Sequence, residues 1–150
     1  MKVFIVFLAL FTVGLSFTSY QGDMSAYVHM QTVLKEACEE CAGGAALLLD
    51  MEEYGNGRLV FDQEQGRKYA EKYTEHILKD ALKGNVKSAV CTLKFKDDKV
   101  NDFAASDPEY SYPYPAVTAV IELETEDLFG LPFLSVTEVE RQACYELSSL

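Results

Sequence analysis

Four cysteines are the residues whose type and spacing bear most directly on chemistry: Cys38, Cys41, Cys91 and Cys144. Cys38 and Cys41 have the Cys-x-x-Cys spacing of thioredoxin-type redox sites. The residues around them, however, predict the interior of a helix, where no helix N-terminus lowers the pKa of a thiol. Two cysteines three positions apart on an apolar helical face are typical of small buried side chains. Thiol catalysis is therefore not expected.

A metal site and a disulfide are the other roles open to these cysteines. Zinc would need a partner for Cys38 and Cys41, but no second Cys-x-x-Cys or His-x-x-x-His pair accompanies them. Outside the cytoplasm, four cysteines allow three pairings; a bond from the helix to the sheet and one between Cys91 and Cys144 both stay open. We expect no metal and no cofactor, and we keep all four cysteines as candidate disulfide residues.

Other catalytic patterns are missing from the sequence. No serine lies in a nucleophile elbow, and the stretch Gly55-Asn-Gly57 lacks the Lys and Ser/Thr of a phosphate-binding loop. His29 and His76 lie on separate predicted helices. The net charge of −11 also excludes nucleic acid as an expected partner, because no basic stripe is present to displace phosphate counterions. The sequence predicts a protein that is not an enzyme.

The elements that position these residues begin with an uncharged apolar segment from Val3 to Tyr20. As a helix it would span about 27 Å, slightly less than the hydrocarbon layer of a bilayer. It is either a retained anchor or a cleaved secretory signal. We favour the anchor because no clear small-x-small cleavage site and no flexible linker follow. We therefore divide the chain into an anchor or signal segment, residues 1–20, and an extracytoplasmic α+β domain, residues 21–150.

The apolar segment continues directly into an amphipathic helix that reaches about Asp50. Its apolar residues recur every three or four positions, and they are Tyr27, Met30, Leu34, Ala37, Cys38, Cys41, Ala45 and Leu48. Gly43 and Gly44 are unusual there because a glycine inside a helix costs about 1 kcal/mol relative to alanine. They predict the close approach of another backbone, either from this domain's own sheet or from a neighbouring subunit.

The rest of the chain predicts a second helix and an antiparallel sheet. Asp62 and Gln65 resemble a capping box at the start of a helix over 62–83. The predicted buried side of this helix consists of Tyr69, Tyr73, Ile77, Leu78, Ala81 and Leu82.

Alternating patterns predict strands near 88–95 and 117–124, with a turn at 97–99 after the first of them. A last strand is expected over 134–147, but its phase is ambiguous, because Val136 and Val139 lie on opposite faces unless a bulge intervenes. The expected fold class is α+β: a long N-terminal helix, a second helix and a meander of three or more antiparallel strands. A Tyr/Pro-rich loop at 101–115 offers Tyr110, Tyr112 and Tyr114 as candidate contact residues.

Three regions of this chain form an ordered pattern: the helix of residues 23–46, the alternating strand of residues 116–125, and the segment of residues 128–143 with its Leu-Phe-Gly-Leu turn and closing strand. Together these regions resemble TadE/TadG-like proteins of tight-adherence (Flp) pili. The regions cover 50 of the 150 residues, one third of the chain. Cys38, Cys41, Gly43 and Gly44 stand where the family pattern has alanines and an aspartate.

The resemblance implies a pilin-like or accessory subunit of a tight-adherence, type IV-like pilus and secretion apparatus. Such a protein is held in the cell membrane by its N-terminal helix, and its partners are other pilus or secretion subunits. Since residues 3–20 contain no acidic residue, unlike processed pilins, an unprocessed anchor near the base fits better. The alternative is a freely secreted α+β binding or inhibitor domain, cystatin-like, although the inhibitory Gln-x-Val-x-Gly loop is missing.

Overall fold

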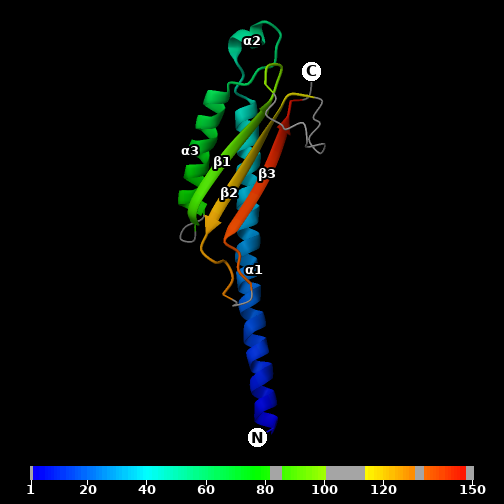
Figure 1. Ribbon diagram of the computed structural model, residues 1–150, viewed down its shortest axis with the longest axis vertical. Coiled ribbons are helices and arrows are strands. Elements are labelled where there is room, and N and C mark those ends of the chain that lie inside the picture. Colours follow the sequence, from blue (N-terminus) through cyan, green and yellow to red (C-terminus); the bar gives the residue numbers. More distant parts are fainter. Residues whose placement is uncertain (1, 82–85, 101–113, 131–133, 148–150) are drawn as a thin grey trace.

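The computed structural model describes residues 2–81, 86–100, 114–130 and 134–147, and for residues 77–81 it describes the backbone alone. In chain order the elements are α1 (Lys2–Ala46), α2 (Met51–Gly55), α3 (Gln63–Ala81), β1 (Val86–Lys96), β2 (Ala116–Thr125) and β3 (Glu138–Glu146). The described strands form one antiparallel sheet in the order β1-β2-β3 (Figure 1). The predicted α+β class and the antiparallel meander are confirmed.

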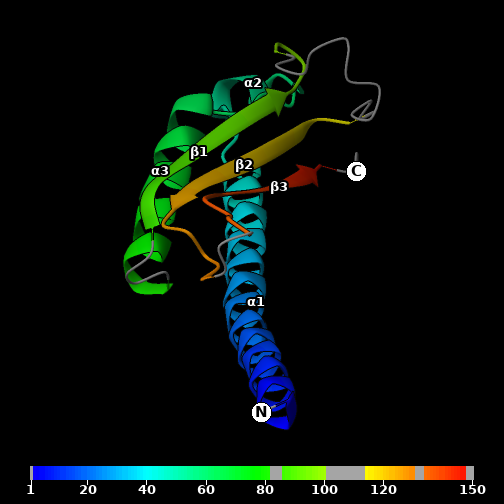
Figure 2. The same ribbon diagram turned by 60° about the horizontal axis from the view of Figure 1, so that its bottom comes forward.

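The first part of α1 extends away from the remainder of the molecule (Figures 1 and 2). Residues 2–19 are exposed throughout, and we call them the stem. The described residues from Tyr20 onward form the head, in which α1 and α3 pack on the same face of the sheet. Within the head, α1 lies against β2, β3 and α3, while α3 also lies against β1. The sheet and α3 thus enclose only the second half of α1.

The predicted apolar stripe of α1 is the face that the head buries. Buried residues on this helix recur at the expected spacing, and they are Met30, Leu34, Ala37, Cys38, Cys41, Ala42, Ala45 and Ala46. Tyr27 and Leu48, at the two ends of the predicted stripe, are only partly buried. The position of the stripe was therefore predicted correctly from its period of three and four residues.

The prediction that this helix reaches Asp50 was wrong, because α1 ends at Ala46. The chain then turns, and Leu49 pairs with Phe61 in an isolated antiparallel bridge. The N–H of Asp50 donates to the carbonyl of Val60 at 2.9 Å, so the backbone leaves the helix to bond with the segment after α2. The carboxylate of Asp50 then caps α2 by accepting the N–H of Glu52 at 3.0 Å. These long-range bonds have no local sequence signal.

The start of α3 matches the prediction, but its cap has a different geometry. Asp62 Oδ1 accepts the N–H of Gln65 at 3.0 Å, which is an ordinary N-cap. In a capping box the Gln side chain would accept the N–H of Asp62, but that N–H donates to the carbonyl of Leu48 instead. The Gln65 amide donates to the Asp62 carboxylate at 2.7 Å. The helix end was predicted at 83, where the residues lie outside the described ones.

The buried face of α3 differs from the predicted one. Tyr69 and Tyr73 were expected to lead it, but both are partly buried, whereas Gly66, Ala70 and Thr74 are buried. A Cβ on Gly66 would lie 3.3 Å from the Phe95 ring, so small residues bring α3 close to the sheet. The remaining predicted positions, from Ile77 onward, lie outside the described side chains. Size rather than hydrophobicity therefore selects the face of α3.

The register of the sheet resolves the phase of the last strand. Val139 pairs with Leu123, and both are buried on the helix side of the sheet. Val136 lies before β3 begins: its N–H donates to the Asp127 carboxylate, and its carbonyl accepts the N–H of Leu128. No bulge is needed, because the strand starts at Glu138 and not at 134 as predicted. The segment before it belongs to the β2–β3 connection.

Candidate functional site

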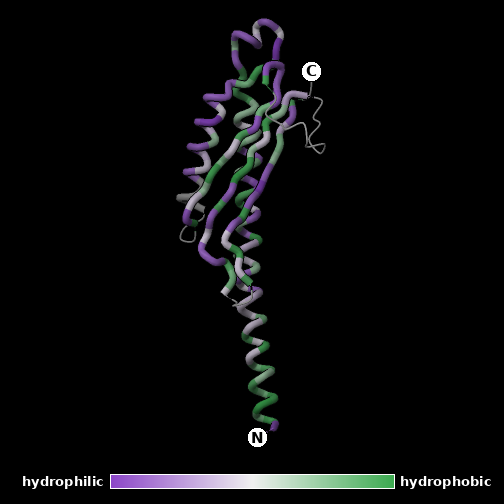
Figure 3. Tube along the Cα trace, viewed as in Figure 1, coloured by the Kyte–Doolittle hydropathy of each residue, from purple (hydrophilic) through white to green (hydrophobic). Residues whose placement is uncertain are grey.

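The stem is the most unusual surface of the molecule. Its large apolar side chains are between 51% (Leu8) and 84% (Val3) exposed. Among the described residues, α1 is the one helix that is long and apolar enough to cross a membrane, judged by length and composition. Beyond a hydrophilic N-terminal tip, the part of α1 that extends from the head is coloured as hydrophobic or neutral (Figure 3). A soluble protein rarely leaves so much contiguous apolar surface bare.

Three hydroxyl groups of the stem are hydrogen-bonded within the helix. The hydroxyl of Thr12 donates to the Leu8 carbonyl at 2.8 Å. Those of Ser16 and Thr18 donate, each at 3.0 Å, to the carbonyls four residues before them. Such bonds hide hydroxyls from an apolar surrounding, in which an unpaired polar group is costly. The stem thus needs no water for these three groups.

The β2–β3 connection packs on α1 where the stem ends. The Phe129 ring stacks on Tyr20 with 6.0 Å between centroids and also contacts the Tyr27 ring at 6.0 Å. The N–H of Gly130 donates to the Asp23 carboxylate at 3.0 Å. The predicted apolar turn, which begins at Leu128, therefore docks on α1 through Phe129 and Gly130. Residues 131–133 lie outside the described part of the chain.

Gly43 and Gly44 face side chains of the same chain. A Cβ on Gly44 would meet the ring of Tyr69 on α3, since its Cε1 and Cζ lie 2.1 and 2.6 Å away. A Cβ on Gly43 would lie 3.7 Å from Tyr145 of β3, an ordinary contact. The sequence predicted that another backbone, from the sheet or from a neighbouring subunit, approaches this glycine pair. What lies against Gly44 instead is a side-chain ring of α3, and Gly44 is the position that requires glycine.

Cys38 is buried and bonded to the sheet. Its thiol donates to the carbonyl of Arg141 at 3.1 Å. Burial raises the pKa of Cys38 to about 11, and the nearby Arg141 charge offsets this only in part. The side chain of Arg141 in turn donates to Gln31 on α1. Cys38 is thus a protonated thiol held between α1 and β3.

Cys41 meets a cysteine that is distant in the sequence. Its thiol is hydrogen-bonded to Cys91 of β1, and it lies 3.8 Å from Thr74 Oγ1 of α3 and 3.9 Å from the Ala70 carbonyl. Hydrogen bonding to Cys91 and burial both raise the pKa of Cys41. The same contact, opposed by burial and aided by Thr74, lowers the pKa of Cys91 to about 7. Three elements therefore meet at this thiol pair.

Cys144 lies apart from the other cysteines. It pairs in register with Thr118, whereas Cys91 pairs with Ile121, so the two cysteines point to opposite faces of the sheet. They also lie on the two outer strands, about 10 Å apart at the usual strand spacing, whereas disulfides need Cα atoms within about 7 Å. This geometry excludes the Cys91–Cys144 bond that the sequence left open, and the helix-to-sheet pairing remains.

Metal binding gains no support from the described part of the chain, where no group of three or more His, Cys, Asp or Glu side chains is arranged to hold an ion. His29 is exposed on α1, and His76 lies on α3. The thiols of Cys38 and Cys41 instead bond to oxygen atoms and to Cys91.

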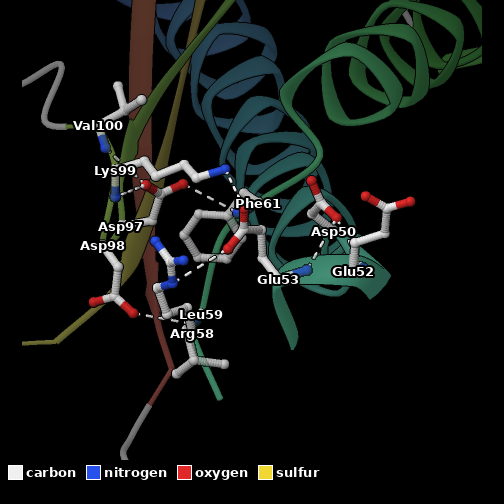
Figure 4. A network of polar contacts seen from close by, with 10 residues as sticks. All are labelled: Asp50, Glu52, Glu53, Arg58, Leu59, Phe61, Asp97, Asp98, Lys99 and Val100. Carbon is white, nitrogen blue, oxygen red and sulfur yellow. Dashed lines mark hydrogen bonds and ion pairs between the residues drawn. The ribbon is translucent and has the colours of Figure 1, made fainter. Parts of the chain in front are cut away.

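A polar clamp ties the end of β1 to the segment between α2 and α3 (Figure 4). Asp97 accepts the N–H of Phe61 at 3.0 Å and, through its other oxygen, the N–H of Val100 at 2.8 Å. Asp98 accepts the N–H of Leu59 at 2.9 Å. The sequence predicted a turn at 97–99, but it gave no sign that these carboxylates bond across the molecule.

Charged side chains complete this clamp. Glu53 of α2 forms ion pairs with Arg58, at 3.3 Å, and with Lys99 just after β1 (Figure 4). The clamp immediately precedes the predicted Tyr/Pro-rich loop. Tyr110 and Tyr112 lie outside the described residues, while Tyr114, next to β2, is 41% exposed.

Sequence reasoning missed two of the residues that join these sites. Thr74 contacts the thiol pair, and its only signal was a small polar residue one helical turn after Ala70. Asp23 binds the apolar turn, and its only signal was its place at the end of the apolar segment.

Comparisons of this chain with protein-family models, with curated proteins and with solved structures find no match.

Proposed function

We propose that this protein is a non-enzymatic, membrane-anchored, pilin-like or accessory component of a tight-adherence, type IV-like pilus or secretion apparatus. The observation that carries the proposal is the division of α1 into two parts. One unbroken helix of 45 residues is bare and apolar over the stem, yet it forms the central support of the head. A helix built in this way holds a folded domain rigidly next to a bilayer.

The stem supports the anchor in three ways. It has no charge from Val3 to Tyr20, its bonded hydroxyls suit an apolar solvent, and Tyr20 marks the boundary with the head. Tyrosine is enriched at the membrane–water interface, where an apolar ring and a polar hydroxyl are both accommodated. The length of the stem, about 27 Å, is only slightly less than the thickness of the hydrocarbon layer, so slight thinning of the bilayer would compensate for the difference.

The charges flanking the stem support an extracytoplasmic head. Lys2 is the first residue of the stem, whereas Asp23 is the first charged residue after the stem and Lys35 the first lysine or arginine. Basic residues near a span tend to stay on the cytoplasmic side. The net charge of −11 then keeps the exported head soluble and discourages non-specific association.

The arrangement of the family-like regions supports the assignment to tight-adherence pili. The helix, the alternating strand and the Leu-Phe-Gly turn with its closing strand are distant in sequence, yet they pack together as α1, β2, the Phe129 turn and β3. If the resemblance were due to chance, there would be no reason for the three regions to pack against one another. α3 and β1 add to this unit from one side (Figure 2).

A non-enzymatic role is supported by the state of the Cys-x-x-Cys pair. A catalytic thiol needs a lowered pKa, but burial raises the pKa values of both Cys38 and Cys41. Neither residue lies at a helix N-terminus, because α1 continues for more than thirty residues before them. The pair is therefore suited to packing rather than to turnover.

The deciding experiment is the mass of the native N-terminus in fractionated cells. We expect the intact stem in a membrane fraction that resists alkaline carbonate, with the head digested by protease added outside the cytoplasmic membrane. A chain starting near Tyr20 and found in the medium would refute the anchor. Protection of the head from external protease would refute its extracytoplasmic location.

Partner identity is tested by photo-crosslinking in cells. A photoreactive phenylalanine is placed at Val90, 56% exposed on the outer sheet face, or at Tyr114. The control position is Glu64, exposed on α3. We expect crosslinks from the sheet or loop positions to subunits of the pilus or secretion apparatus, above those from Glu64. Crosslinks only to unrelated proteins, with normal pilus assembly after deletion of this chain, would refute the assignment.

A freely secreted α+β binding or inhibitor domain is the second candidate, and one observation favours it. Residues 2–19 are exposed throughout, so cleavage just before Tyr20 would remove the stem and leave the Tyr20–Phe129 contact in place. The same N-terminal mass measurement separates the two candidates, because only the secreted domain starts near Tyr20.

A further inference from the structure

We propose that Cys41 and Cys91 are a redox modification site: an external disulfide oxidises them to a bond that ties α1 to β1. The oxidant is of the class of glutathione disulfide or an oxidised thiol oxidoreductase. An oxidising surrounding for the head follows from the proposed function, whereas the chemistry of the pair depends only on its geometry.

The first support is the position of the two thiols around the same residues of α3. Cys41 lies on the buried face of α1, with its sulfur 3.8 Å from Thr74 Oγ1 and 3.9 Å from the Ala70 carbonyl. Cys91 lies on the helix-facing side of β1 and lines a groove together with Thr74 and Ala70. Thiols that meet in this way between two packed elements need little rearrangement to form a disulfide, which requires close Cβ atoms.

The second support is access to one sulfur of the pair. A groove of about 420 Å³ lies between α3 and β1, and its lining includes Ala70, Glu71, Thr74 and Cys91. Cys41 does not line this groove and is completely buried. Cys91 is therefore the sulfur that an external disulfide reaches first, and Cys41 is placed behind it to complete the bond.

The third support is the unequal acidity of the two thiols. Hydrogen bonds from Cys41 and Thr74 stabilise the thiolate of Cys91, so its pKa falls although partial burial opposes the change. The thiolate is the species that attacks a disulfide. Cys91 is thus the attacking group and Cys41 the resolving group.

The reaction balances in two exchange steps. The Cys91 thiolate attacks one sulfur of the external disulfide, so that a mixed disulfide forms and one thiolate leaves. Cys41 then loses its proton and attacks the Cys91 sulfur, forming the Cys41–Cys91 bond and releasing the second thiolate. The protons from Cys41 and Cys91 end on the two released thiols. The protein loses two electrons and two protons, and the oxidant gains them.

The test uses the full-length chain, reduced and then exposed to glutathione disulfide in detergent micelles. After free thiols are blocked, trypsin should yield the peptide of residues 36–58 linked to that of residues 88–94. Cys38→Ala is the matched control, three positions before Cys41 on the same buried stripe. We expect the link to persist in Cys38→Ala and to disappear in Cys41→Ala and Cys91→Ala.

A variant carrying Cys38→Ala and Cys144→Ala keeps only the proposed pair and avoids substitution at the pair itself. Oxidation should lower its intact mass by two hydrogens and raise its midpoint of chemical unfolding, and dithiothreitol should reverse both changes. Two free thiols after oxidation of this folded variant would overturn the proposal. So would a Cys38–Cys91 link as the main product of the unmodified chain.

The order of attack is tested by brief exposure to glutathione disulfide. In the Cys41→Ala variant we expect a glutathione adduct to accumulate on Cys91, because no resolving thiol is left to displace it. An adduct mainly on Cys144, with Cys91 unmodified, would refute entry through the groove. None of these results depends on membrane location, so failure of the proposed function and failure of this inference are distinguishable.

Discussion

The two halves of α1 belong to one helix but are built for different surroundings. In the stem, apolar side chains occur on every side, and the large ones are at least half exposed. In the head, the same helix is buried along one stripe and carries charged residues such as Lys35 and Glu39 elsewhere. A helix that is apolar all round suits lipid, whereas a striped one suits packing between a sheet and water. The change occurs between Tyr20 and Met30 without a break in the helix.

The glycines of α1 show the same division. Gly14 in the stem and Gly22 just beyond it have open space where a Cβ would lie, whereas Gly44 has the Tyr69 ring there. Glycine is thus optional at the first two positions and necessary at Gly44 in the packed part of the head. Lipid and water adapt to a side chain of any size and shape, but a tightly packed neighbouring residue does not.

The largest effect that separates the two halves is expected from truncating a leucine in each. Leu34 is 1% exposed and Leu10 is 67% exposed. Leu34→Ala should lower the free energy of unfolding of the head by about 2–5 kcal/mol, because it leaves a cavity in the core. Leu10→Ala should change it by less than about 0.5 kcal/mol. Chemical unfolding in detergent measures both, and equal effects would contradict the division of α1.

A charge placed on each side of the boundary should separate the halves in membrane binding. Gly14→Arg puts a cation within the stem, at a cost of about 2–3 kcal/mol of insertion free energy. Gly22→Arg is the control, since it gains the same helix propensity just beyond the stem and also meets open space. We expect a lower membrane-bound fraction for the first variant only. Equal retention of both would argue against a lipid-embedded stem.

Neighbouring glycines in the head sharpen the comparison further. Gly44→Ala should destabilise the head by about 1–3 kcal/mol, because the new methyl group overlaps a ring that stacks on Tyr73. Gly43→Ala should be neutral or stabilising by up to about 1 kcal/mol, since its methyl group makes an ordinary contact.

A double variant checks the cause of the Gly44→Ala effect. Adding Tyr69→Ala removes the ring that meets the new methyl group, so the two substitutions should be non-additive. Strictly additive losses in chemical unfolding would show that the methyl group and the ring do not collide.

The smallest effect on stability is expected from lowering the pH, through Asp127 in the β2–β3 connection that packs at the boundary between stem and head. N–H groups of Phe129 and Val136 hold the pKa of Asp127 below its ordinary value. Its contribution is therefore complete above the unfolded-state pKa of about 4 and declines as the pH falls through the lower folded-state pKa. The stability gap between the unmodified chain and Asp127→Asn should narrow over that acid range. If this difference in stability instead widened as the pH fell, the pKa of Asp127 would not be lowered by folding.

Short-range patterns were enough to predict most of the elements. The buried stripe of α1, the Asp62 cap and the alternation of β1 and β2 all depend on residues within a few positions of one another. The end of α1 was missed because Asp50 bonds to Val60, a partner supplied by the fold. The face of α3 was missed because large aromatic residues suggested a core position that only glycine and alanine can fill so close to Phe95.

The candidate sites also differ in whether the sequence alone reveals them. The stem is evident from the chain alone, because eighteen consecutive uncharged and mostly apolar residues have the same meaning in any fold. The pairing of Cys41 with Cys91 is not, since it requires the rotation of α1, the register of β1 and the nearness of α3 at once. Composition and period depend on neighbours in sequence, whereas the meeting of two thiols fifty residues apart depends on how separate elements pack.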